Sequence, residues 1–163
     1  WSKYTMKFLI ICFAMLFFGC SNSEVESSEK LWVSAIEFRE NDDLKSSITN
    51  FKSIIKNYPN SEFSVKSQFQ IADIYLNDVK DYPFAIEEFE ILINNYPESP
   101  LAKKSSFMVA YIYGNYLDAF SEAMDKYELF KEKYPNDELI PSVEFELEGL
   151  KKYQPSIDSL NSL

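Results

Sequence analysis

Apolar residues recur along most of this chain with a period of 38 residues. The dipeptide Tyr-Pro marks the period, because it begins at Tyr58, Tyr96 and Tyr134, each 38 residues after the one before. A constant period of this length is typical of a structural unit that is repeated along the chain. Other large side chains keep the same spacing: Phe51, Phe89 and Tyr127; Ile54, Leu92 and Phe130; Leu31, Phe69, Phe107 and Phe145; Val33, Ile71, Val109 and Leu147.

Each repeat contains two helical patterns of different character. In the middle repeat, Phe69 and Leu76 lie on one face of the first helix, and Ile71 lies on another. This helix is apolar on two sides, so we expect it to be packed between neighbours. The second helix has one apolar stripe that includes Phe89, and it is expected to expose Glu88 on its outer face.

The pattern therefore predicts an all-α solenoid of three helix pairs and one closing helix. The predicted helices cover residues 29–40, 43–57, 61–78, 82–95, 99–116, 118–133 and 138–152.

Proline explains why Tyr-Pro recurs at the end of each pair. A residue before proline is disfavoured in the α region, and proline cannot donate the next helical hydrogen bond, so Pro59, Pro97 and Pro135 each end an outer helix. The Asn-Ser, Glu-Ser-Pro and Asn-Asp segments that follow supply capping side chains for the next helix. Within the middle repeat, Asp81 can cap the outer helix and Pro83 lies in its first turn.

Composition agrees with this fold and narrows the chemistry. The 163 residues include 14 Phe and 11 Tyr but only 3 Gly, which favours helices packed through large aromatic side chains. Histidine is absent from the sequence, which removes the usual general base and the usual zinc ligand. We therefore expect no metal and no cofactor. The net charge of −10 repels phosphate, so nucleic acid is not an expected partner.

The first 19 residues are predicted to be a signal peptide, with Met6 as the start of translation. Residues 6–20 read MKFLIICFAMLFFGC, in which one lysine precedes eleven apolar residues. Eleven helical residues span only about 16 Å, whereas a bilayer core is about 30 Å thick. This length favours a secretory leader over a membrane-spanning helix.

The pair Gly19-Cys20 resembles the bacterial lipobox, in which the cysteine is lipidated and becomes the first residue of the mature protein. Phe17 and Phe18 depart from the family's preferred residues. The alternatives are an ordinary cleaved signal with Cys20 as an incidental thiol, or a retained apolar helix. Residues 20–28 would form the lipidated cysteine and a polar tether, and Ser21 after the cysteine favours the periplasmic face of the outer membrane.

One repeat reproduces a known helix-pair motif. Ala72, Tyr75, Ala85, Phe89 and Pro97 follow the spacing of the tetratricopeptide repeat. The 38-residue unit and its Tyr-Pro resemble repeats of bacterial envelope proteins of the BamD and CpoB families, over residues 28–152. The resemblance implies a non-catalytic protein-binding scaffold, in BamD-type proteins one for outer-membrane assembly. The chain departs from BamD-type proteins in having three repeats instead of about five, and its first repeat has serines at two small-residue positions.

The resemblance places a partner-binding groove on the first helices, along residues 29–152, with residues 153–163 as a C-terminal tail. The expected partner is an envelope protein or a peptide segment, with membrane contact through the lipid and no small-molecule substrate. The expected groove residues are Phe38, Arg39, Asp73, Leu76, Asn77, Tyr111, Asn115 and Lys152.

Two other functions remain open. A soluble periplasmic CpoB-like protein that coordinates envelope or cell-division machinery would share the repeats and lack the lipid. A glycan-cleaving enzyme could use two carboxylates without histidine. The acidic residues of the segment 122–133 are spaced as on a solvated helix, so the enzyme would require a pair of carboxylates that converge in a closed pocket.

Overall fold

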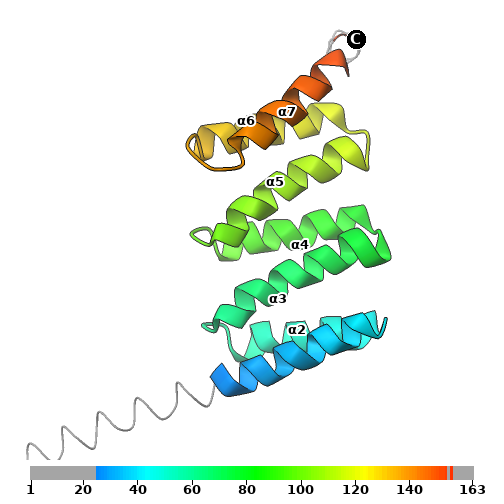
Figure 1. The fold of residues 1–163 in the computed structure, drawn as a ribbon, viewed down its shortest axis with the longest axis vertical. Helices are drawn as coiled ribbons and strands as arrows, with labels where there is room; N and C mark the ends of the chain where they lie inside the picture. Colours follow the sequence, from blue (N-terminus) through cyan, green and yellow to red (C-terminus); the bar gives the residue numbers. More distant parts are fainter. Residues whose placement is uncertain (1–24, 154, 156–163) are drawn as a thin grey trace, which may run out of the picture. The chain divides into compact units, whose positions relative to one another are not determined.

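The computed structural model describes residues 25–153 and 155, and within these residues it contains helices and turns but no strand. The helices cover residues 25–40, α2 (Leu44–Asn57), α3 (Glu62–Asp73), α4 (Tyr82–Asn95), α5 (Pro100–Asn115), α6 (Phe120–Lys133) and α7 (Ile140–Leu150) (Figure 1). A π-helical turn, η1 (Ile74–Val79), continues α3, and a 3₁₀ turn, η2 (Lys151–Tyr153), continues α7. The predicted all-α, helix-pair repeat class is confirmed.

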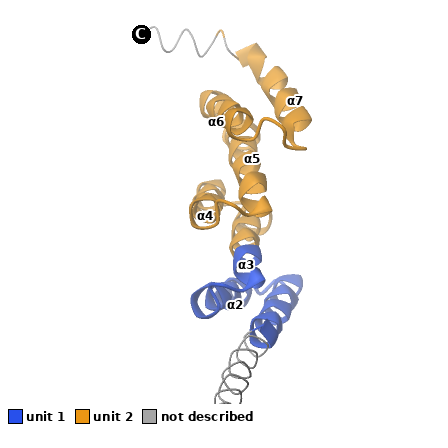
Figure 2. Ribbon diagram, turned by 90° about the vertical axis from the view of Figure 1, so that its left-hand side faces the viewer, with its two compact units in different colours: residues 1–67 blue, residues 68–163 orange. Residues whose placement is uncertain are grey.

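The chain divides into two compact units, residues 1–67 and 68–163, and the boundary falls within α3 (Figure 2). In unit 1, the helix over residues 25–40 packs on α2 through aromatic rings. The Trp32 ring lies 5.3 Å from that of Phe51 and 5.7 Å from that of Phe63, measured between centroids. Ser28 is buried and its hydroxyl lies 3.0 Å from that of Ser61.

Unit 2 repeats the same helix-on-helix arrangement twice. Edge-to-face pairs join the first helix of each repeat to its outer helix, Phe69 to Phe89 at 5.4 Å and Phe107 to Tyr127 at 5.6 Å. Phe89 and Tyr127 have no exposed surface, as expected for positions that align on the period. α5 and α7 lie on one side of this unit, with α4 and α6 behind them (Figure 1).

The Tyr-Pro segments adopt one backbone geometry three times. Tyr58, Tyr96 and Tyr134 have φ near −130° and ψ near 53–56°, and each donates its N–H to the carbonyl four residues earlier. Three residues after each tyrosine comes a side chain that accepts a nearby backbone N–H: Ser61 and Ser99 accept one from the first turn of α3 and of α5, and Asp137 accepts one from Leu139, the residue before α7. The predicted role of Tyr-Pro in ending the outer helix is confirmed. Capping by the polar residues that follow is confirmed for α3 and α5, whereas α7 has no side-chain cap. Asp81 also caps α4 as predicted.

The closing helix α7 differs from the first helices before it. Glu148 and Lys151 stand where the two preceding repeats have alanine and tyrosine, and these two side chains form an ion pair. Phe145, which aligns with half-buried residues, is 76% exposed because no outer helix covers α7 in the described part of the chain. At the other end, Val33 is 58% exposed although the aligned Ile71 and Val109 are buried.

Three further expectations are corrected. Residues 25–28 are helical, so the predicted tether over 20–28 is at most residues 20–24. The end of the helix predicted over 61–78 is π-helical, which sequence periodicity did not indicate. Glu88 is partly buried, because its carboxylate accepts a hydrogen bond of 2.6 Å from the buried amide of Gln68. The signal peptide, Cys20 and nearly all of the predicted tail lie outside the described residues.

Candidate functional site

The first helices of unit 2 bring four of the predicted groove residues onto equivalent positions. Asp73 and Tyr111 are one period apart, as are Asn77 and Asn115, one turn further along. The Asn77 amide donates to the Asp73 carboxylate at 2.9 Å. The Asn115 amide donates to the Tyr111 carbonyl at 3.2 Å and lies 3.4 Å from the carboxylate of Glu146 on α7. We call the surface formed by Asp73, Asn77, Tyr111, Asn115 and Glu146 the polar wall.

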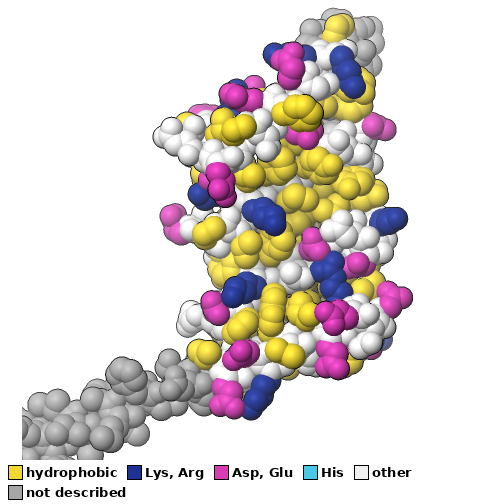
Figure 3. Space-filling view, viewed as in Figure 1, with side chains coloured by type: hydrophobic (Ala, Val, Ile, Leu, Met, Phe, Trp, Pro, Cys, Tyr) yellow, Lys and Arg dark blue, Asp and Glu magenta, His cyan; other side chains and the backbone are white. Residues whose placement is uncertain are grey.

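An unbroken series of aromatic rings borders the polar wall. The ring of Phe107 stacks on that of Tyr111 at 6.2 Å, and Tyr111 meets Tyr116 edge-on at 5.9 Å. Tyr116 in turn stacks on Tyr82 of α4 at 4.6 Å. We call these four residues the aromatic series. Tyr116 is 42% exposed and Tyr111 is half-buried, and Figure 3 shows apolar side chains gathered over α5 on this side.

Tyr111 is a neutral hydrogen-bonding group. Burial is the main reason that the pKa of its hydroxyl is raised, and Tyr116 and Glu146 add to the effect. A raised tyrosine pKa lies still further above neutral pH, so the hydroxyl retains its proton. It can therefore donate to a carbonyl while the ring presents an apolar face.

The remaining predicted groove residues are placed differently. Leu76 is only 4% exposed and belongs to the core formed with Ala85 and Phe89, so its prediction as a groove residue is wrong. The residue lies in the π-helical turn, where the side-chain direction departs from the α-helical pattern used to place it. Lys152 is exposed in η2 and lies 4.8 Å from the ring of Tyr153. Phe38 and Arg39 are half-exposed and belong to unit 1, whereas the polar wall lies in unit 2.

Four residues of this site were missed by sequence reasoning: Tyr82, Phe107, Tyr116 and Glu146. Phe107 was identified as a periodic apolar residue but not as a groove residue. Glu146 lies two periods after Gln70 and one after Met108, neither of which belongs to the polar wall, so the repeat register did not indicate it. Tyr116 ends α5 and Tyr82 begins α4. Their contact depends on how the ends of two helices meet, and a periodic pattern within one helix does not predict such a contact.

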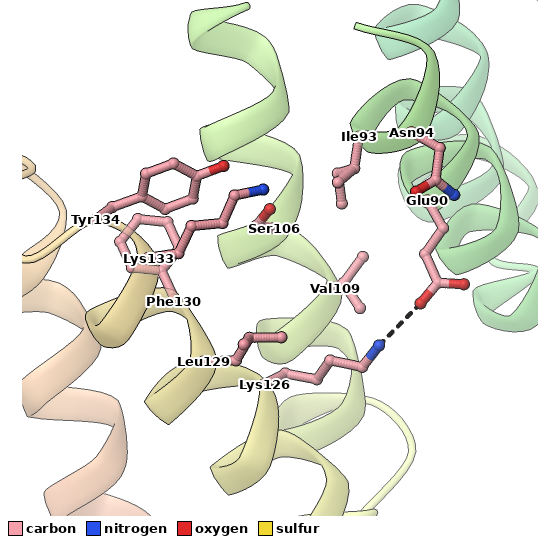
Figure 4. Close-up of a pocket in the computed structure, with 10 residues that line it drawn as sticks. All are labelled: Glu90, Ile93, Asn94, Ser106, Val109, Lys126, Leu129, Phe130, Lys133 and Tyr134. Atoms are coloured by element: carbon pink, nitrogen blue, oxygen red, sulfur yellow. Dashed lines mark hydrogen bonds and ion pairs between the residues drawn. The ribbon is translucent and has the colours of Figure 1, made fainter. Parts of the chain in front are cut away.

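Apart from the polar wall, a hollow lies on the other side of α5, between α4 and α6 (Figure 4). This outer cavity has a volume of about 310 Å³ and is lined by Glu90, Ile93, Asn94, Ser106, Val109, Lys126, Leu129, Phe130, Lys133 and Tyr134. Glu90 is the sole carboxylate among these residues, and it is paired with Lys126 at 2.9 Å. The outer cavity therefore lacks the two converging carboxylates that glycan cleavage would require.

The described residues contain no group of three or more Cys, Asp or Glu side chains placed to hold a metal ion. Among the same residues, none of the helices combines the length and the apolar character needed to cross a bilayer.

Comparison with known proteins adds one finding to this geometry. The family model of the tetratricopeptide repeat matches residues 35–61, which include part of the first helix and all of α2. The matched segment lies in the repeat whose small-residue positions hold serine. No curated protein matches the chain. The matched segment and the helix pairs that recur with the same caps and turns together support a tetratricopeptide-repeat protein.

Proposed function

We propose that this protein is a non-catalytic scaffold whose polar wall and aromatic series hold an extended segment of a partner protein. The observation that carries the proposal is the continuous aromatic series beside a row of amide and carboxylate groups on the first helices of unit 2. Tetratricopeptide repeats generally bind proteins, which supports the same class of function.

The chemistry of the wall suits a peptide backbone flanked by apolar side chains. Tyrosine rings offer a large contact area with few rotatable bonds, so little side-chain entropy is lost when they bind. Asn77 and Asn115 each carry donors and an acceptor that can pair with peptide groups. Asp73 and Glu146 add negative charge, which favours a segment carrying lysine or arginine.

Site-specific photo-crosslinking in cells tests the binding face. A photoreactive residue at position 115 should form adducts with a partner, whereas one at the exposed position 87 on α4 should not. Introducing Tyr111→Ala should reduce the adduct at 115, and mass spectrometry should place the crosslinked residue within a defined partner segment. Equal adducts from 115 and 87, or an adduct unaffected by Tyr111→Ala, would contradict the proposal.

We further propose that the scaffold is a lipoprotein at the periplasmic face of the bacterial outer membrane, in outer-membrane protein assembly. The support is the leader-like segment, the lipobox-like Gly19-Cys20 and the resemblance of the repeats to envelope lipoproteins. Four residues separate Cys20 from the first described helical residue, and four extended residues span at most about 14 Å. A lipid at Cys20 would hold the scaffold close to the bilayer.

Fatty-acid labelling tests the location. A clickable fatty acid should label the wild-type protein, which should fractionate with membranes, and Cys20→Ser should abolish both. Recovery of unlabelled wild-type protein in the soluble periplasmic fraction would instead favour the CpoB-like alternative, a soluble repeat protein that coordinates envelope or division machinery.

A further inference from the structure

Glu146 of the polar wall has no cationic partner in the part of the chain that the structure describes. Its side chain is half-buried, and the hydrogen bond that its carboxylate accepts among the described residues comes from the Asn115 amide at a long 3.4 Å. By contrast, the Glu90 carboxylate of the same unit is paired with Lys126 at 2.9 Å. A carboxylate that is partly withdrawn from water and holds one long hydrogen bond has acceptor capacity left for a cation.

Aromatic groups surround the Glu146 carboxylate. Burial is the main reason that the pKa values of the Tyr111 and Tyr127 hydroxyls are raised, and the negative charge of Glu146 contributes to the rise in both. The carboxylate is therefore close to both tyrosines. Tyr127 is fully buried, but Tyr111 retains exposed surface, so its ring is accessible to a partner. A cation at this place can be attracted by the carboxylate and by the ring face together.

Gly149 leaves an open place beside Glu146. It lies one turn further along α7, at the repeat position that Asp73 and Tyr111 occupy in the two preceding repeats. A Cβ atom added at Gly149 would meet nothing within 4 Å beyond the backbone of its own helix. A side chain from another protein can therefore enter where the two preceding repeats place a side chain of their own, and reach the Glu146 carboxylate.

We propose that this part of the polar wall is a subsite for an arginine side chain of the partner segment. The guanidinium lies over Gly149, donates two parallel hydrogen bonds to the Glu146 carboxylate and stacks on the Tyr111 ring. Arginine fits better than lysine, because its planar fork matches a carboxylate and stacks on aromatic rings, whereas an ammonium is a more strongly hydrated point charge. The subsite rests on the proposed function, since it requires that the polar wall holds a partner segment.

Peptide titrations followed by protein NMR test the subsite on the purified protein. The probes are the capped peptide N-acetyl-Gly-Leu-Arg-Leu-Gly-amide and its counterparts with lysine or citrulline at the central position. Citrulline has the shape of arginine without the charge. We expect the arginine peptide to shift the amide resonances of Asn115 and Gly149 and to bind about tenfold more tightly than the citrulline peptide, with lysine between them.

Three results of these titrations would overturn the proposal. They are equal binding of the arginine and citrulline peptides, tighter binding of the lysine peptide than of the arginine peptide, and absence of shifts with the arginine peptide up to about 10 mM.

Two variants test the proposed contacts. Glu146→Gln should abolish the preference for arginine over citrulline and leave binding of the citrulline peptide unchanged, because it removes only the charge. Gly149→Leu should weaken binding of the arginine peptide by about tenfold, because leucine fills the open place. Glu148→Gln is the matched control, since Glu148 lies on the same helix and is paired with Lys151. A preference for arginine that survives Glu146→Gln, or that is lost equally in Glu148→Gln, would overturn the assignment.

Crosslinking in cells separates failure of the subsite from failure of the proposed function. With the photoreactive residue at position 115, Glu146→Gln should reduce the adduct, and the crosslinked partner segment should contain an arginine. An adduct that depends on Tyr111 but is unaffected by Glu146→Gln would overturn the arginine subsite and leave the proposed function standing. Absence of any adduct at 115 in the wild-type protein would instead count against the proposed function and, with it, the subsite.

Discussion

At the scale of single residues, the turn between the two helices of each pair repeats the same backbone conformation with the 38-residue period. Asp42, Lys80 and Asp118 are one period apart, and each has a positive φ of 51–63° in the left-handed region. The next residue is the N-cap of the outer helix, and Asp43 and Asp81 cap the helix with their carboxylates. Ala119, at the third equivalent position, has no side chain that can accept a hydrogen bond.

Ala119→Asp should therefore stabilise the protein. The new carboxylate would accept a backbone N–H in the first turn of α6 and interact favourably with the positive end of the helix dipole. We expect the free energy of unfolding to rise by about 1 kcal/mol. Denaturant unfolding monitored by circular dichroism measures it, and Asp81→Ala should lower the same quantity by a similar amount. A destabilised Ala119→Asp variant would show that the third turn differs from the second.

Phe89→Ala tests the aligned core positions. The ring is fully buried and pairs with Phe69, so its truncation should cost about 3–5 kcal/mol of unfolding free energy. The exposed Glu87→Ala is the matched control and should change stability by less than about 0.5 kcal/mol. Glu88→Ala should fall between them, at about 1 kcal/mol, because it removes one of two hydrogen bonds of Gln68. Equal denaturation midpoints for Phe89→Ala and Glu87→Ala would contradict the assignment of faces.

At the scale of helices, close packing depends on small residues where two helices meet. Gly114 of α5 lies so near α6 that an added Cβ would be 3.3 Å from the Cβ of Ala123. It also lies one period after Leu76, so the same repeat position holds a large side chain in one pair and none in the next. Gly149 of α7 has open space around its Cα.

Substituting these two glycines should therefore have opposite effects. Gly149→Ala should raise the free energy of unfolding by about 0.5–1 kcal/mol, because alanine loses less backbone entropy in a helix. Gly114→Leu, which copies the residue of the preceding repeat, should destabilise by roughly 1–3 kcal/mol or more through overpacking. Thermal melts of both variants check this prediction. A neutral Gly114→Leu would mean that α5 and α6 can separate without cost.

The start of α7 is joined to α5 by an ion pair that should respond to pH. Lys103 donates to Asp137 at 2.7 Å, and this bond, followed by that from the Leu139 N–H, lowers the pKa of the Asp137 carboxyl. Since the folded pKa is depressed, the stabilisation is present above the unfolded value of about 3.9 and is lost as the pH falls through the folded value.

Asp137→Asn isolates that ion pair, because the asparagine carbonyl can still accept the Leu139 N–H. The variant should be less stable than the wild type at pH 7, and the difference should shrink as the pH falls below about 4. Urea unfolding of both proteins between neutral and acidic pH measures the difference. A difference that stays constant with pH would assign the effect to the hydrogen bond from Leu139 instead of the charge.

At the scale of the whole molecule, the excess of acidic residues acts on all helices at once. Aspartate and glutamate number 26 and lysine and arginine 16, so like charges repel across the folded surface. Added salt screens this repulsion, with a Debye length that falls from about 30 Å at 0.01 M to about 8 Å at 0.15 M. We expect sodium chloride to raise the melting temperature over this range. A decrease would show that the surface ion pairs outweigh the net charge.

Structural features that depend on residues close together in the chain could be predicted from the sequence alone. The 38-residue period, the ends of the outer helices at Tyr-Pro and the caps at Ser61 and Ser99 follow from proline geometry and local hydrogen bonding, and each is found as expected. Helix pairing followed as well, because two-sided and one-sided apolar patterns leave few ways to bury their faces.

Features that depend on contacts between helices required the tertiary structure. Burial of Leu76, the bond from Gln68 to Glu88 and the meeting of Tyr82 with Tyr116 arise where side chains from different segments converge. The outer cavity arises in the same way, from three helices whose sequences carry no sign of it. The periodic pattern specifies which face of a helix is apolar, whereas the shape left between packed faces is set by the side chains that meet there.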